Sequence, residues 1–315
     1  MVMNATARSS SETDSLTPAQ WIPHVRHLLA AIDLTDGDDA IIEAANELIK
    51  NHPEIALTLL TVIPEEYLTV GDFGVVPDPM ISVRKNVATE ALEKLRTRLP
   101  AGVQVEILVS EGRPADEICR IAKELKTNFI LMTSHGRTGV KLLMMGSTAE
   151  EVVHNAPCSV LVLKPKAGKN SLPLRIGRIG VAYDESESSR AALALGLQFM
   201  RHSVSHLDLI SAVEPITLLA PEMAIVSDRE RLEEAQVRLN QVCRDISSSL
   251  PIEINLRLGK PWRVVKEIAE ERECDLLIIG AHEYWRPGDW ILGTTAEKVV
   301  RHTACPVLIV RPARS

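Results

Sequence analysis

The chain contains two copies of one segment, and corresponding landmarks lie at a nearly constant distance from each other. A Gly-Arg-Pro triplet at 112–114 returns as Gly-Lys-Pro at 259–261, which is 147 positions later. Further upstream, Asp33 returns as Asp184 with an offset of 151. A nearly fixed offset over many landmarks indicates a duplicated unit. Each half of the 315 residues is long enough to bury a core of its own.

The repeat divides the chain into two domains joined by a short linker. Residues 1–23 are rich in Ser and Thr and lack the apolar core of a signal peptide, so we expect a disordered tail there. The first domain is predicted over 24–166 and the second over 176–315. Lys, Gly, Asn, Ser and Pro cluster between the two domains, which is typical of a linker at 167–175.

The bulk properties of the chain disfavour several classes of protein. The formal net charge of −7 argues against broad binding to nucleic acid or to an anionic membrane, because both favour basic surfaces. No apolar run approaches the roughly 20 residues that span a bilayer. The five cysteines include no C-x-x-C pair, so free thiols in a reducing cytoplasm are expected. We therefore expect a cytoplasmic protein that binds neither nucleic acid nor a membrane.

Short apolar runs alternate with helical patterns in both halves, and such runs fit strands that are buried on both faces. Strands are predicted at 26–33, 55–63, 103–109, 129–132 and 160–163, and again at 179–184, 207–213, 252–258, 276–279 and 307–310. Residues 64–79 are predicted to form a long loop. The spacing of Val83, Val87, Ala91 and Leu95 predicts an amphipathic helix after it. The alternation predicts an α/β fold with a five-stranded, mostly parallel sheet in each half and helices on both faces.

Two features fall at the predicted carboxyl ends of strands, where open α/β sheets bind their ligands. An acid closes the first strand of each half, as Asp33 or Asp184, and its carboxylate can accept hydrogen bonds from both hydroxyls of a ribose. The loops after the fourth strands, at 133–136 and 280–283, consist largely of small residues. Small residues allow backbone N–H groups to approach phosphate oxygens.

A third feature opens the last helix of each half, where Gly146 and Gly293 are each followed by a hydroxyl residue. A helix N-terminus adds unpaired N–H donors and the positive end of the helix dipole. Together the three features describe a site for a ribose linked to phosphates. Structural alternatives stay open, because Asp33 could cap the following turn and Ser147-x-x-Glu150 has the pattern of a capping box.

The spacing of the small residues resembles that of the nucleotide-binding universal stress proteins. That family carries Gly, two residues, Gly, nine residues, and then Gly-Ser or Gly-Thr. The first half keeps this spacing from Thr133 through Gly136 to Gly146. Its flanking segments, Ser-His-Gly-Arg-Thr-Gly at 134–139 and Ala-Pro-Cys-Ser-Val-Leu-Val at 156–162, are similar to the family as well.

The second half keeps the same spacing between Gly280 and Gly293, so the resemblance covers nearly all of residues 24–312 in two copies. The chain is therefore identified as resembling a tandem universal stress protein. The resemblance implies two flavodoxin/Rossmann-like (adenine nucleotide alpha hydrolase-like) domains packed as an intrachain pseudo-dimer. It also implies that the last strands, 159–163 and 306–310, are edges at which domains pair.

The resemblance further implies an adenine nucleotide as ligand: ATP, ADP or AMP, with Mg²⁺ as an optional companion. In the first half it implies contacts from Asp33, Leu34, Val62, Thr133, Ser134, His135, Gly136, Arg137, Gly139, Gly146, Ser147 and Thr148. In the second half it implies a weaker site at Asp184, Ser186, Gly280, Ala281, His282, Gly293, Thr294 and Thr295.

Both halves depart from the family pattern. Thr133 replaces the first Gly of the first half, and the acidic stretch 36–39 is expected to repel phosphate there. Asp38 or Asp39 is also expected to cap the helix that follows. In the second half Glu283 replaces the second Gly, and repulsion between a carboxylate and a phosphate charge would cost about 4 kcal/mol at roughly 4 Å and an effective dielectric constant of about 20. We therefore expect binding mainly in the first domain.

These implications favour a cytoplasmic stress-response protein that a bound nucleotide regulates, with at most slow ATP hydrolysis. The chain has no Walker A loop and no SGGxDS or HIGH-type motif, which disfavours an enzyme such as an adenylating ligase. The alternative is a nucleotide-independent interaction protein that uses the aromatic loop 284–290 or the long loop 64–81 as its partner surface. A homodimer and an unidentified protein partner are compatible with both functions.

Overall fold

The computed structural model describes residues 25–35, 37–50, 52–65, 67–69, 75–77, 80–134, 145–164, 176–202, 206–216, 227–246, 251–283 and 290–311. The tail expected at 1–23 and the linker expected at 167–175 lie outside these ranges. The first half contains β1 (His27–Ala31), α1 (Asp38–Ile49), β2 (Ala56–Ile63), β3 (Tyr67–Thr69), β4 (Val75–Pro77), α2 (Ile81–Arg96), β5 (Val105–Glu111), α3 (Pro114–Glu124), β6 (Phe129–Thr133), α4 (Ser147–Asn155) and β7 (Ser159–Leu163).

The second half repeats the same alternation of strands and helices. It contains β8 (Arg178–Ala182), α5 (Glu187–His202), β9 (His206–Val213), α6 (Asp228–Ile246), β10 (Ile252–Leu258), α7 (Pro261–Glu271), β11 (Leu276–Gly280), β12 (His282–Glu283), β13 (Trp290–Ile291), α8 (Thr294–His302) and β14 (Val307–Val310). The short strands β3 and β4 pair with each other, as do β12 and β13.

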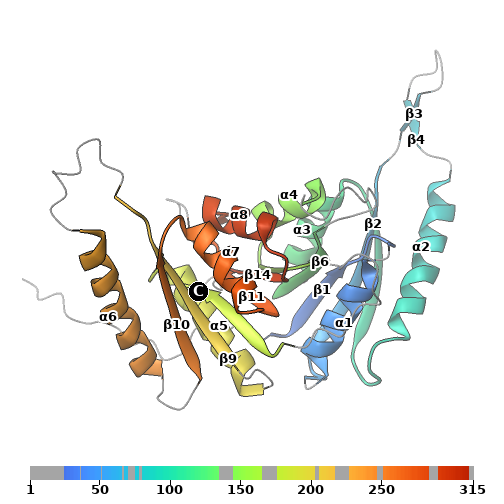
Figure 1. Ribbon diagram of the computed structural model, residues 1–315. Coiled ribbons are helices and arrows are strands. Elements are labelled where there is room, and N and C mark those ends of the chain that lie inside the picture. The colour runs from blue at the N-terminus through green and yellow to red at the C-terminus, as the bar shows by residue number, and fades with distance from the viewer. Residues whose placement is uncertain are drawn as a thin grey trace, which may run out of the picture.

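The long strands of both halves form one ten-stranded sheet in the order β10-β9-β8-β11-β14-β7-β6-β1-β2-β5 (Figure 1). Five strands come from each half, and neighbours within a half are parallel. Numbered along the chain, the five strands of either half lie in the order 3-2-1-4-5. This is the Rossmann order rather than the flavodoxin order. The expected α/β fold with a mostly parallel sheet is confirmed.

Helices cover both faces of the sheet, and each face carries an apolar core that runs through both halves (Figure 1). One core joins α1, α2, α5 and α6, and includes Ile42, Leu92 and Leu239. The other joins α3, α4, α7 and α8, and includes Val152 and Val299. Strands β6 and β7 are buried at every position, because helices pack on both of their faces.

Two elements of the first half differ from expectation. The region 64–79, which was expected to be a loop, contains the hairpin of β3 and β4. On α2, Val83 and Val87 are 48% and 59% exposed, whereas Ala88 and Leu92 are buried. A repeat of four residues drifts around a helix that has 3.6 residues per turn, so residues spaced by four do not stay on one face. The expected helix exists, but its buried face lies elsewhere.

The two halves join through antiparallel pairing of β7 with β14, the last strand of each repeat. A basic residue after each of these strands crosses to the other half. Lys164 Nζ donates to Val300 O at 2.5 Å, and Arg311 Nη2 donates to Val153 O at 2.7 Å. Both acceptors lie in the last turn of a helix, where carbonyls lack intrahelical partners and positive charge is favourable. The tandem therefore pairs its own last strands and secures them from both sides.

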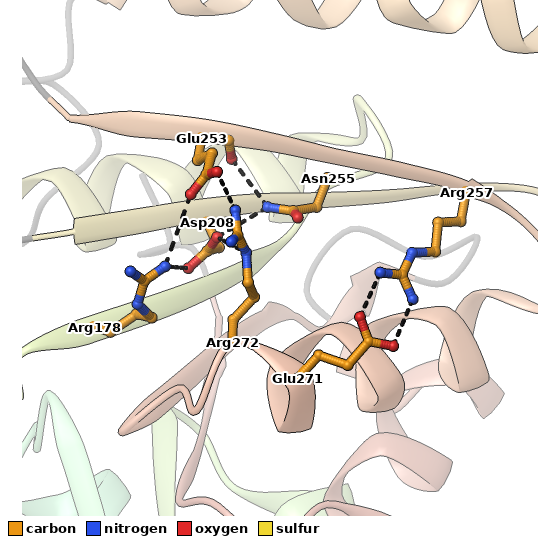
Figure 2. A network of polar contacts seen from close by, with 7 residues as sticks. All are labelled: Arg178, Asp208, Glu253, Asn255, Arg257, Glu271 and Arg272. Atoms are coloured by element: carbon orange, nitrogen blue, oxygen red, sulfur yellow. Dashed lines mark hydrogen bonds and ion pairs between the residues drawn. The ribbon is translucent and has the colours of Figure 1, made fainter.

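A network of charged side chains around the buried Asp208 closes the amino ends of the strands in the second half (Figure 2). Asp208 on β9 is fully buried and accepts hydrogen bonds from Arg178 Nη1 at 2.8 Å and from Asn255 Nδ2 at 2.9 Å. Arg272, at the end of α7, pairs with Asp208 at 3.1 Å and also with Glu253. The network lies at the end of the sheet opposite to the carboxyl ends of the strands, so it supports the fold and not the candidate site.

Candidate functional site

The strand order reverses between β1 and β6 in the first half, and between β8 and β11 in the second. The predicted acids Asp33 and Asp184 follow the carboxyl ends of β1 and β8, at these reversal points. The next residues, Leu34 and Glu185, have φ angles of 60° and 66°. This left-handed conformation is uncommon for residues other than glycine, and it turns the chain sharply after each strand. Both halves thus build the same turn.

Side-chain oxygens hold the turn after β1 in place. Thr35 Oγ1 donates to Asp33 Oδ1 at 2.5 Å, and the Asp33 N–H donates to Asp38 Oδ1 at 3.3 Å. Asp38 is the first residue of α1, and Gly37 is the N-cap. The expectation that Asp38 or Asp39 caps this helix is therefore wrong, because the Asp38 carboxylate reaches back to the end of β1 instead.

The turn after β8 uses a neutral side chain at the same place. Ser189 Oγ accepts a hydrogen bond from the Asp184 N–H at 3.3 Å, and Asp184 Oδ1 accepts one from the Ser186 N–H at 3.1 Å. Ser189 is the counterpart of Asp38, since each lies five residues after the acid of its half. Sequence patterns did not reveal these two residues as supports of the turn, although their shared offset of 151 was visible.

Asp38 is a titratable group with an unusual environment. Its exposed fraction is 5%, and burial, followed by the charge of Asp33, raises the pKa of Asp38 to about 7. A carboxyl with this pKa carries a proton for part of the time near neutral pH. The neighbouring Asp39 is exposed and pairs with Arg98 at 2.5 Å. The acidic stretch expected to repel phosphate is thus less charged than its sequence suggests.

The end of the fourth strand packs against this turn, and the two halves place the glycine on opposite sides of the contact. A Cβ on Gly37 would lie 3.1 Å from Thr133 Cγ2. In the second half, Gly280 stands in the place of Thr133 and Ser188 in the place of Gly37. A Cβ on Gly280 would lie 2.5 Å from the backbone carbonyl carbon of Ser188. Thr133 therefore fits because Gly37 provides the space.

Helices α4 and α8 both begin at a glycine N-cap. Gly146 has φ −67° and ψ 152°, Gly293 has φ −63° and ψ 151°, and no side-chain hydrogen bond caps either helix. The capping-box expectation is wrong, because Ser147 is already the first helical residue and Glu150 pairs with Arg301 of the other half at 3.0 Å. Amide donors in the first turn of a helix with no such cap are suited to an anion.

A chain of contacts places the start of α4 beside the turn that carries Asp33. The Gly146 N–H donates to Ser134 O at 2.8 Å, and the Ser134 N–H donates to Leu163 O at 2.9 Å. Ser134 is fully buried and directly follows Thr133, whose side chain lies against that turn. The acid, the end of the fourth strand and the helix start therefore gather at one end of the sheet, as the sequence predicted.

The sequence profile described as the Universal stress protein family matches residues 24–164 and, again, residues 175–311. The chain belongs to the universal stress protein family. Universal stress protein MJ0531 of Methanocaldococcus jannaschii is 34% identical over 137 residues, which cover 41% of this chain and 78% of that protein. Universal stress protein YxiE of Bacillus subtilis is 32% identical over 145 residues, which cover 44% of this chain and 97% of that protein.

A solved structure is similar to nearly the whole tandem universal stress protein. The crystal structure of a universal stress protein from Archaeoglobus fulgidus DSM 4304 matches with a TM-score of 0.68 at 20% identity. The match covers 92% of this chain and 100% of that chain. At this level of identity, the likeness shows the fold.

Some predicted contacts of this tandem universal stress protein lie outside the described residues. These are His135, Gly136, Arg137, Gly139 and the side chain of His282. Val62 is half-buried at the second-last position of β2. Ala281 is fully buried, and its N–H donates to Val310 O at 2.9 Å. The first-turn hydroxyls are exposed at Ser147 and Thr294 and half-buried at Thr148 and Thr295.

Several other features of this universal stress protein bear on its chemistry. Among the described residues, no three His, Cys, Asp or Glu side chains come together to hold a metal ion. All five cysteines are free, and burial raises the pKa of both Cys158 and Cys274 to about 12, so these two thiols stay protonated near neutral pH. In the part of the chain that the structure describes, no helix is both long and apolar enough to cross a bilayer.

Proposed function

We propose that this tandem universal stress protein binds an adenine nucleotide in the cytoplasm as a regulatory ligand, mainly in the first domain. One observation carries the proposal: the glycine-initiated helix α4, whose start has no side-chain cap, lies at the same end of the sheet as the turn that carries Asp33. An anion-binding helix start beside a carboxylate suits a ligand that combines phosphates with a ribose.

Each predicted contact has a distinct role in this proposal. The half-buried Asp33 carboxylate accepts hydrogen bonds from the ribose hydroxyls. The backbone N–H groups at the start of α4, with the exposed hydroxyl of Ser147 and the half-buried hydroxyl of Thr148, bind phosphate oxygens. The strand end at Val62 borders the adenine. The role is binding with at most slow hydrolysis, and Mg²⁺ accompanies the phosphates without a dedicated set of protein carboxylates.

The second cleft is proposed to bind the same ligand more weakly. It has the same helix start at Gly293 and the same turn at Asp184. Asp184 is exposed, whereas Asp33 is half-buried, so the second acid is held in a more polar surrounding. Glu283 lies in β12, three positions after the last residue of β11, and stands where the family has glycine.

Calorimetric titration with ATP, ADP and AMP, with and without Mg²⁺, tests the proposal. Gly146→Trp is expected to abolish binding in the first cleft, because its backbone angles suit any residue while the indole fills the anion site. Asp33→Asn should weaken binding and still accept the hydrogen bond from Thr35. Gly293→Trp is the matched control and should leave the tighter site in place.

Two results would contradict the proposal. One is the absence of binding of all three nucleotides at millimolar concentration, which would favour the nucleotide-independent interaction protein. The other is unchanged binding in the double variant Gly146→Trp/Gly293→Trp, which would place the ligand away from both clefts. Robust nucleotide consumption would show an enzyme instead of a regulatory binder.

A further inference from the structure

The two clefts differ in one group that supports the acid-bearing turn. Asp38 Oδ1 accepts the N–H of Asp33 at 3.3 Å, and Ser189 Oγ accepts the N–H of Asp184 at 3.3 Å. The two hydrogen bonds have the same length. The chemistry is different, because a carboxyl group can lose a proton near neutral pH and a hydroxyl group cannot.

Backbone hydrogen bonds from Asp33 and Thr35 stabilise the charged form of Asp38, but burial and a like charge outweigh them. Asp33, at the end of β1, is the charged group that faces it, and it carries the same sign. Strand β6 contributes the uncharged Thr133, which lies against the preceding Gly37. On α1 itself, Asp39 is exposed and its charge is paired with Arg98, which follows α2. The Asp38 carboxyl is therefore buried beside a like charge.

We propose that Asp38 couples ligand binding in the first cleft to the uptake of a proton, whereas the second cleft, with Ser189, binds without one. The inference rests on the proposed function, since it requires an anionic nucleotide beside Asp33. It assigns the two otherwise similar clefts different responses to pH, and it makes Asp38 a positioning residue that sets the charge of the first cleft.

The direction of the effect follows from electrostatics and linkage. Burial and the Asp33 charge already favour the protonated form of Asp38 near neutral pH. Phosphate groups bring further negative charge to this end of the sheet, so the bound state favours the protonated form still more. Binding and protonation then assist each other by the same factor. Affinity in the first cleft falls as the pH rises through neutrality.

The first experiment uses the protein without ligand. The carboxyl carbon of Asp38 is followed by NMR as a function of pH, with Asp38→Asn used to assign the signal. The signal is expected to show a pKa of about 7 for Asp38. A midpoint below about 5, close to the value of an unperturbed aspartate, would overturn the proposal without reference to any ligand.

The second experiment measures ATP affinity by calorimetry in the Gly293→Trp variant, which leaves only the first cleft open. Binding is expected to be about tenfold weaker at about pH 8 than at about pH 6, for one proton that titrates near neutrality. Because the phosphates of ATP titrate as well, the reference is Asp38→Asn in the same background. Asp38→Ser, which copies the second cleft, is the second reference and is expected to match it.

The matched control is Asp39→Asn, which removes an equal charge from the next position and should keep the full pH dependence. The same pH dependence in the Asp38 variants as in the parent would overturn the proton coupling while leaving the proposed function intact. Absence of ATP binding at every pH would overturn the proposed function, and the coupling with it. At about pH 8, where Asp38 is mostly ionised before binding, titration in buffers of different ionisation enthalpy should show uptake of about one more proton in the parent than in Asp38→Asn.

Discussion

Single residues show how two divergent halves keep the same turn at the site. Where Thr133 closes the fourth strand, Gly37 leaves room for its methyl group. Where Gly280 closes the fourth strand, Ser188 occupies the position of Gly37 and its backbone approaches closely. Each contact needs only one glycine. It lies in the turn after the first strand in the first half, and at the end of the fourth strand in the second half. A departure from the family glycine in one strand is thus matched by a glycine in the facing turn.

Gly280→Ala is expected to destabilise the protein more than Gly37→Ala. The new methyl group would meet the backbone of Ser188 at 2.5 Å, and a backbone cannot move aside as a side chain does. We expect a loss of about 2 kcal/mol or more at Gly280, a size typical of overpacking, and under about 1 kcal/mol at Gly37, whose neighbour is the Thr133 side chain. Urea unfolding measures both variants, and equal losses would contradict the asymmetry.

Asp38 is expected to make stability depend on pH. Its pKa rises from 3.8 to about 7 on folding, so the folded state holds more protons than the unfolded state between these values. The associated stability is fully present below about pH 4 and is lost as the pH rises to about 7, by at most about 4 kcal/mol. Asp38→Asn should flatten the unfolding free energy over this range, measured by urea titration at several pH values. Asp39→Asn should not flatten it, and an identical profile for both variants would refute this view.

The first strands of the two halves start with different polar residues at equivalent positions, one in a charged set of contacts and the other in an uncharged set. At the start of β8, Arg178 pairs with the buried Asp208 (Figure 2). At the matching start of β1, His27 lies 2.9 Å from both Thr58 and Thr127 through its two ring nitrogens. Burial lowers the pKa of His27, so this set stays neutral where the second half is charged. Both sets satisfy polar groups that would otherwise be costly to bury.

Asp208→Ala should destabilise the protein by about 2 kcal/mol, because it removes the fully buried carboxylate that two half-buried arginines and Asn255 share. Arg178 and Arg272 both lose a contact in this variant. Glu271→Ala removes the exposed pair with Arg257 drawn in Figure 2 and is the control, with a much smaller expected loss. Thermal and urea unfolding provide the measurement. Losses of similar size would show that burial does not decide the value of these pairs.

At the scale of the whole molecule, the duplication produces one continuous sheet instead of two separate sheets. The antiparallel pairing of β7 with β14 uses the edge strand of each half, and both apolar cores run across the junction. The crossing contacts of Lys164 and Arg311 repeat each other about the junction. The last strands of the repeat are therefore already paired within one chain and are not open edges.

Arg311→Met is expected to weaken the junction. Arg311 is 6% exposed and donates to the carbonyls of Val153 and His154, which would lose a buried donor. A loss of about 2 kcal/mol in urea unfolding is expected, since buried acceptors without partners are costly. The control is Arg244→Met. This exposed arginine donates to the exposed Gln241, and its replacement should change stability by no more than about 0.5 kcal/mol. Equal effects would show that the crossing contact does not hold the halves together.

The sequence by itself determined the duplication, the α/β class and the position of most strands. Continuous apolar strands such as β6 and β7 are buried on both faces between two layers of helices. Their apolar pattern therefore predicts their burial directly. The acids and glycines of the site were also visible, because the acids repeat at an offset of 151 and the glycines that start the last helices repeat at an offset of 147. The exposed face of α2 could not be predicted, because the helix has several apolar residues and the sequence does not determine which of them pack against the sheet.

Only the tertiary structure decided which residues face each other across the sheet. The placement of glycine at Gly37 in one half and at Gly280 in the other depends on a contact between segments about 100 residues apart. The sequence of either segment does not determine which residue faces it. The same holds for Asp38, whose helix-start position suggested a cap until the fold brought it beside Asp33. The pairing of β7 with β14 could not be predicted for a similar reason. The edge of a strand offers backbone N–H and C=O groups, but these do not determine which strand pairs with them. Local patterns fix what each segment must bury or bond, and packing selects the partner.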